Sequence, residues 1–130
     1  MERSEFAQIA KRAYELNLKG KKLGVWQLAD DINAEKLKNH DIFEIGIKLV
    51  SEGVCYENII KVLTNKINIE QDASLKLLKN IQKEAVLCIY KKYNSFILIN
   101  TLLSYIDDKE KENAKKQLKE KIFSDYFNMY

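Results

Sequence analysis

Residues 41–63 read DIFEIGIKLVSEGVCYENIIKVL, and this stretch predicts two short helices joined by a turn. Apolar side chains recur at helical spacing on both sides of the turn: Phe43, Ile47 and Val50 before it, and Ile59, Ile60, Leu63 and Ile67 after it. Asp41 is a suitable N-cap for the first helix, and Glu44 can reach back to its free amides. Gly53 tolerates the left-handed backbone that ends a helix. The stretch therefore predicts a helical hairpin.

The composition of the whole chain favours helices. Its 130 residues fit one domain. The chain contains four glycines and no proline, whereas a sheet protein of this length needs many tight turns. We therefore predict an all-α fold, a compact bundle of about six or seven short helices within a single domain, residues 1–130.

Charge, cysteine and histidine content exclude several classes of protein. The 22 Lys and Arg side chains and the 19 Asp and Glu side chains are interspersed and leave a net charge of +3, which argues against a strong polyanion binder. Cys55 and Cys88 are far apart and His40 is the only histidine, so we expect no disulfide, metal site or cofactor. Because the N-terminus is charged where a signal peptide is apolar, we expect a cytoplasmic protein.

The residues that precede the hairpin predict two further helices. The first covers residues 4–17, and a second, shorter one covers residues 25–33. Between them, residues 17–24 read NLKGKKLG and are expected to form a solvated basic loop, because the lysines lack an aromatic or glycine-rich phosphate cradle. Trp26 is expected to anchor the core, as large aromatic residues do in small domains.

Four polar residues in this part are expected at the surface. Arg12 lies on the polar side of the first predicted helix. Asp30 and Asp31 are adjacent, so on a helix their side chains point about 100° apart and do not converge on one atom. His40, next to the expected Asp41 cap, is also expected to face water.

The chain after the hairpin predicts one long helix over residues 69–93 and an apolar one over residues 96–106, with Asn94 as a cap between them. Residues 85–106 are the nearest approach to a membrane span, but lysines and other polar residues interrupt them, so no span is expected. The second helix begins at Phe96 and is apolar on most sides. It should be central in the fold or covered by a partner.

The C-terminal residues 108–130 are expected to form a peripheral helix. Its apolar stripe is narrow and consists of Ala114, Leu118 and Ile122. Such a helix lies lightly on the bundle or pairs with another chain. The other chain can be a second copy of this protein in a homo-oligomer. Aromatic residues gather at the end of the chain, where they either return to the core or form a docking patch: Phe123, Tyr126, Phe127 and Tyr130.

No combination of residues predicts catalysis. The sequence has no Ser, His and acid set at a plausible spacing, no glycine-rich phosphate loop and no zinc-protease motif. A single histidine also limits general acid and base chemistry. We expect a protein that is not an enzyme.

Four runs, in order, resemble a known family: FAQIAKRAY, VWQLADDI, DIFEIGIKLVSEGV and ENIIKVL. Together they are similar to the cytoplasmic segment of the flagellar stator A subunit, MotA, of the MotA/TolQ/ExbB group, over about residues 6–67. The resemblance implies contact with a motor component through charged residues. Arg12 falls near the family's basic position, whereas Ala29 stands at its acidic position, beside Asp30 and Asp31.

The chain also departs from this family. Cys55 and Tyr56 stand in the turn where the family has an Asp and often a Pro. The family's ion-carrying membrane helices have no counterpart in these residues, so the resemblance implies a relative of the cytoplasmic segment that forms no channel alone.

We therefore expect a non-catalytic cytoplasmic protein–protein interaction module, associated through the resemblance with the flagellar motor. The alternative is a small helical nucleic-acid-binding regulator, motivated by the net charge and by Lys19, Lys21 and Lys22, although no basic stripe on a recognition helix is apparent. The residues expected to contact a protein partner are Arg12, Asp30, Asp31, Phe96, Phe123 and Phe127.

Overall fold

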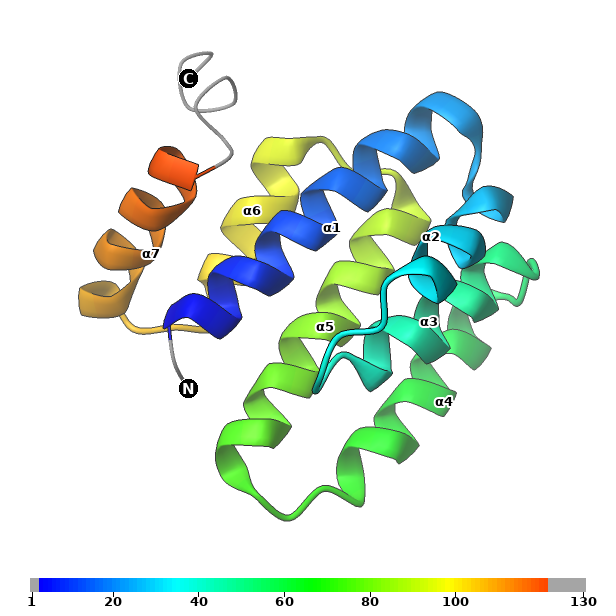
Figure 1. Ribbon diagram of the computed structural model, residues 1–130. Helices are drawn as coiled ribbons and strands as arrows, with labels where there is room; N and C mark the ends of the chain where they lie inside the picture. The colour runs from blue at the N-terminus through cyan, green and yellow to red at the C-terminus, as the bar shows by residue number, and fades with distance from the viewer. Residues whose placement is uncertain (1–2, 122–130) are drawn as a thin grey trace.

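Helix α5 runs through the middle of the molecule, and α1, α3, α4 and α6 pack against it (Figure 1). The computed structural model describes residues 3–121. Within them lie seven α-helices and one short 3-10 helix, η1: α1 Arg3–Leu23, η1 Val25–Gln27, α2 Leu28–Ala34, α3 Asp41–Ser51, α4 Tyr56–Asn68, α5 Ala73–Lys91, α6 Ser95–Leu103 and α7 Asp108–Lys121. No strand occurs in this range, so the predicted all-α bundle is confirmed.

The helices form two groups on either side of α5. Helices α1 and α6 contact one side of it, and α3 and α4 contact the other, with α2 on α3. Helix α7 lies at the edge of the bundle against α1, where Ala114 and Leu118 are buried. Ile122, the third residue of its predicted stripe, lies outside the described residues. Buried apolar side chains from all seven α-helices form one cluster.

Helices α3 and α5 run in the same direction and meet at three successive levels. The Asp41 carboxylate pairs with Lys79 Nζ at 3.3 Å, and the Phe43 amide donates to the side-chain oxygen of Gln82 at 3.1 Å. One turn further, Gly46 packs so closely on α5 that an added Cβ would lie 2.7 Å from Val86 Cγ2. Only glycine allows this approach without a shift of the helices.

The predicted hairpin over residues 41–63 is confirmed as α3 and α4, with Gly53 at φ 78° in the turn between them. The predicted Asp41 cap is wrong. His40 occupies the N-cap position without a side-chain cap bond, and Gln82 of α5 satisfies the Phe43 amide instead. The Gln82 amide group also donates to the Asn39 carbonyl at 2.6 Å. A distant side chain thus replaces the local cap.

The predicted basic loop over residues 17–24 is also wrong, because α1 continues as a helix to Leu23. Gly20 is buried inside this extension, where an added Cβ would lie 3.3 Å from Leu28 Cδ1. Gly24, at φ 93°, follows the helix and reverses the chain into η1. Gly20, which suggested a loop, therefore allows α1 to pack closely against Leu28 of α2.

The predicted solvent exposure of two side chains is wrong. Trp26, expected in the core, is 67% exposed, because its neighbours Val25 and Leu28 supply the apolar contacts of this turn. His40, expected in water, is only 3% exposed. Arg12 is half-buried rather than fully solvated.

The predicted long helix over residues 69–93 begins later than expected. Helix α4 extends to Asn68, and α5 begins after Asp72, whose side chain accepts a hydrogen bond from the Leu75 amide at 3.0 Å. The Asn94 cap is confirmed by its bond from the Ile97 amide at 2.9 Å. Among the residues that the structure describes, no helix combines the length and the apolar character needed to cross a membrane.

Candidate functional site

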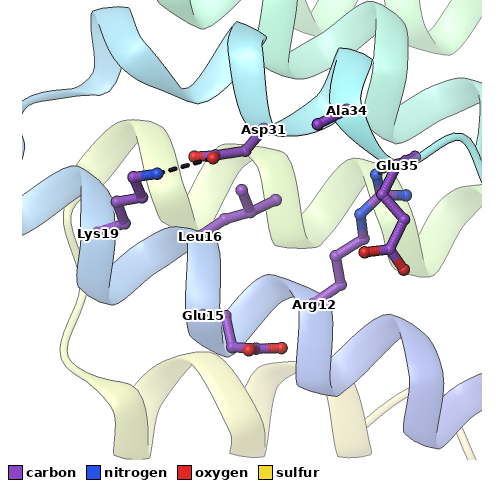
Figure 2. A pocket seen from close by; sticks show the side chains of 7 residues that line it. All are labelled: Arg12, Glu15, Leu16, Lys19, Asp31, Ala34 and Glu35. Carbon is purple, nitrogen blue, oxygen red and sulfur yellow. Dashed lines mark hydrogen bonds and ion pairs between the residues drawn. The ribbon is translucent and has the colours of Figure 1, made fainter.

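A charged pocket lies between α1 and the segment formed by α2 and the residue after it (Figure 2). On α1, Arg12, Leu16 and Lys19 are spaced by four and three residues, which places them in one row on the helix surface. The cavity has a volume of about 360 Å³ and these lining residues: Arg12, Glu15, Leu16, Lys19, Asp31, Ala34 and Glu35. Residues from two chain segments thus form one polar hollow.

Arg12 is the most constrained cation of this pocket. Its Nη1 lies 3.0 Å from Nδ1 of His40, and its Nη2 donates to the backbone carbonyl of Glu35. The guanidinium carbon also lies 5.9 Å from the centre of the Phe43 ring. No carboxylate of the described residues lies within ion-pair distance of Arg12. Among these residues the guanidinium is therefore half-buried without a direct ion pair, although the carboxylates of Glu35 and Glu44 act on it from a longer distance.

The contact with Arg12 determines the protonation state and the tautomer of His40. A guanidinium only donates, so Nδ1 of His40 must accept, and the ring is neutral with its proton on Nε2. Burial and the nearby Arg12 charge lower the pKa of His40 to about 4, against the opposite effect of Asp41. Burial also lowers the pKa of Arg12, while Glu35 and Glu44 act to raise it. The guanidinium nevertheless stays protonated at neutral pH.

An ion pair forms the other end of the pocket. Lys19 Nζ lies 2.7 Å from Oδ1 of Asp31, and Figure 2 shows this pair bridging the two segments. The second oxygen of Asp31 is buried and has no hydrogen-bond partner among the described residues. Asp30, its neighbour, is exposed and does not line the pocket. The two acids diverge, as their adjacency predicted.

The structure therefore brings together only two of the residues predicted to contact a partner, Arg12 and Asp31. Phe96 is 48% exposed at the start of α6 and does not line the pocket. Phe123 and Phe127 lie outside the described residues. The sequence reasoning missed Lys19 and Glu35 as members of the site. The row of Arg12, Leu16 and Lys19 was detectable, but only once residues 17–24 are known to be helical.

The pocket offers a guanidinium, an ammonium and carboxylates, which suits reversible recognition of polar groups. Within residues 3–121, no three His, Cys, Asp or Glu side chains gather as metal ligands would. No family model, curated protein or solved structure matches the chain. The function must therefore be argued from the geometry of the pocket and from the sequence resemblance.

Proposed function

We propose that the chain is a non-catalytic, cytoplasmic protein–protein interaction module, and that its partner binds over the charged pocket between α1 and α2. One observation carries the proposal: the Arg12 guanidinium lines an open pocket, is half-buried, and has no carboxylate at ion-pair distance among the described residues. Removing a charged group from water is unfavourable unless it is paired. Glu35 and Glu44 act on Arg12 only from beyond ion-pair distance, and a carboxylate from a partner would supply a direct pair.

The surroundings of Arg12 support recognition of a protein side chain. Bonds to His40 and to the Glu35 carbonyl fix the guanidinium and leave its other N–H groups as donors. Asp30 is exposed and directly precedes the pocket residue Asp31, so its carboxylate is available to a basic group of the partner. A partner that carries both charge signs would thus find complementary groups around one hollow.

We further propose that this partner is a component of the flagellar motor. The support is the resemblance over about residues 6–67, in which Arg12 falls near the basic position of the family. The exposed Cys55 and half-buried Tyr56 of the turn mark where the chain departs from that family. The proposal therefore rests on the Arg12 pocket and not on the turn.

The experiment measures partner binding with three variants of the full chain and motility with a deletion strain. Arg12→Gln should weaken binding to the purified motor partner about tenfold or more, because a charge-assisted contact is lost. Arg12→Lys should keep part of the affinity. Lys61→Gln, which removes an exposed lysine of α4, is the matched control and should leave binding unchanged.

Thermal unfolding of each variant separates binding from folding, since Arg12 also contacts His40. Normal motility of a deletion strain, together with no motor protein captured by the wild-type chain, would contradict the motor proposal. Equal affinities of Arg12→Gln and wild type for a captured partner would contradict the proposed site.

The rival, nucleic-acid binding, rests on Lys19, Lys21 and Lys22, but Lys19 is already bound to Asp31 at 2.7 Å. Counterion release predicts a steep fall in duplex affinity as salt rises. We expect no binding to generic duplex at low salt, and salt-sensitive binding there would favour the rival.

A further inference from the structure

Three large apolar side chains are exposed where α1 ends and η1 begins. Leu18 is 43% exposed, Leu23 is 47% exposed and Trp26 is 67% exposed. We call these three residues the apolar tip. Figure 1 shows the end of α1 and the turn into α2 at an edge of the molecule, away from the central helix α5. The charged pocket does not include any of the three.

The backbone holds Trp26 outward in a defined position. The Gly24 amide donates to the Gly20 carbonyl at 2.9 Å, and the Ser51 hydroxyl donates to the Val25 carbonyl at 3.0 Å. Leu28, on the other side of Trp26, is fully buried. The turn is thus tied to α1 and α3 at its buried side, and the indole is left facing solvent.

Two lysines accompany the apolar tip. Lys21 and Lys22 are exposed, and they line an open surface whose other residues are Glu15, Leu18, Lys19 and Leu23. Trp26 lies just after this surface in the chain and does not line it. Neither lysine takes part in an ion pair within the described part of the chain. Leu18, Leu23 and two lysines that are unpaired in this range therefore share one surface, and Trp26 follows in the adjoining turn.

We propose that the apolar tip inserts into the surface of an anionic lipid bilayer, with Lys21 and Lys22 on the lipid phosphates. Tryptophan is suited to this boundary, because its ring is apolar and its N–H is polar. Lysine buries its stem while its ammonium stays at the headgroups, and each lysine near an anionic membrane adds to the attraction.

The size and shape of the surface favour lipid over a protein partner. A stable protein–protein interface buries about 800 Å² on each partner, which three side chains at an edge do not supply. The surface around Leu18 and Leu23 is also open, whereas protein anchors fit into complementary pockets. A small apolar anchor with nearby basic residues is what reversible binding at a membrane surface requires.

The test uses the intrinsic fluorescence of the full chain, since Trp26 is its only tryptophan. The probes are vesicles of phosphatidylcholine alone and vesicles of phosphatidylcholine mixed equally with phosphatidylglycerol. With the mixed vesicles, the emission of Trp26 should move to shorter wavelength and the protein should sediment with the lipid. With phosphatidylcholine alone, both effects should be much weaker.

Variants then separate the two contributions. Replacing both lysines, Lys21→Gln with Lys22→Gln, should weaken partition into mixed vesicles roughly thirtyfold, at about 1 kcal/mol for each lysine. Leu23→Ser and Trp26→Ser should each reduce co-sedimentation. Ile69→Ser is the matched control, because Ile69 is 74% exposed beyond the end of α4 and lies outside the tip. It should bind like wild type.

Three results would overturn the proposal. The first is an unchanged Trp26 emission with mixed vesicles at low salt. The second is an equal loss of co-sedimentation in Ile69→Ser and Trp26→Ser. The third is an emission shift with acidic polyglutamate but none with mixed vesicles. That result would assign the apolar tip to a protein partner. Circular dichroism verifies that each variant is folded.

Discussion

At the scale of single residues, His40 shows how the core sets a protonation state. Its ring is buried, stacks at a tilt 5.5 Å from Phe43, and accepts a hydrogen bond from Arg12. Protonation would remove the acceptor and place two cations side by side. The unfolded chain has neither constraint, so its histidine titrates near the ordinary value of 6.5.

This difference predicts a loss of stability on mild acidification. Because the pKa of His40 is about 4 in the folded state and 6.5 in the unfolded state, only the unfolded chain takes up the proton between these values. The free energy of unfolding should therefore fall as pH drops from 6.5 to about 4, by up to about 3 kcal/mol from this group. Urea unfolding at several pH values measures it.

His40→Asn is the control, because the asparagine oxygen can accept from Arg12 and does not titrate. Carboxylates titrate in both proteins, so the difference between wild type and His40→Asn isolates the histidine. Parallel pH profiles in the two proteins would contradict the assigned role of His40.

At the scale of helices, the start of α3 depends on α5. The side chain of Gln82 is fully buried. Its oxygen accepts from the Phe43 amide at 3.1 Å, and its nitrogen donates to the Asn39 carbonyl at 2.6 Å. One residue therefore satisfies two backbone groups at the N-terminus of α3, a position that a local Ser, Thr or Asp usually fills.

Gln82→Leu should destabilise the protein by about 2–4 kcal/mol, because it leaves the buried Phe43 amide and the part-buried Asn39 carbonyl without partners. The loss should be concentrated at the first turn of α3. Hydrogen exchange should show faster exchange of the Phe43 amide. Gln71→Leu, at an exposed position in the α4–α5 connection, should change neither quantity. Unchanged Phe43 exchange in Gln82→Leu would refute the cap.

The helices could be predicted where the decisive signals are local. The α3–α4 hairpin follows from apolar spacing and from Gly53, all within one stretch of sequence. The Gln82 cap could not be predicted, because it joins residues 39 positions apart. The same is true of Trp26: which side of η1 faces inward depends on contacts with Gly20 and Ser51. Lys19 could not be assigned to the Arg12 pocket for a similar reason, because the sequence predicted a loop where α1 continues as a helix.

At the scale of the whole molecule, the chain builds its core both from successive helices and from helices far apart in the sequence. Helices α3, α4 and α5 pack on one another in order, whereas α1 contacts α5, α6 and α7, which follow much later in the sequence. Helical bundles with many local contacts fold within microseconds to milliseconds. The contacts of α1 with α5, α6 and α7 therefore join segments from the two ends of the described residues.

The chain contains no proline, so refolding from urea should lack the slow phase of prolyl isomerisation, which takes about 10–100 s at 25 °C. Stopped-flow circular dichroism should recover the full helical signal in the fast phase. The experiment is done under reducing conditions because Cys55 and Cys88 are free thiols. A major phase of tens of seconds would contradict this expectation.

The three levels of contact between α3 and α5 act together as a fixed register. The pairs Asp41–Lys79, Phe43–Gln82 and Gly46–Val86 succeed one another along both helices. A slide of either helix by one turn would break all three contacts at once. The start of α3, beside His40 and Arg12, is consequently held in place by α5 through side chains that lie far away in the sequence.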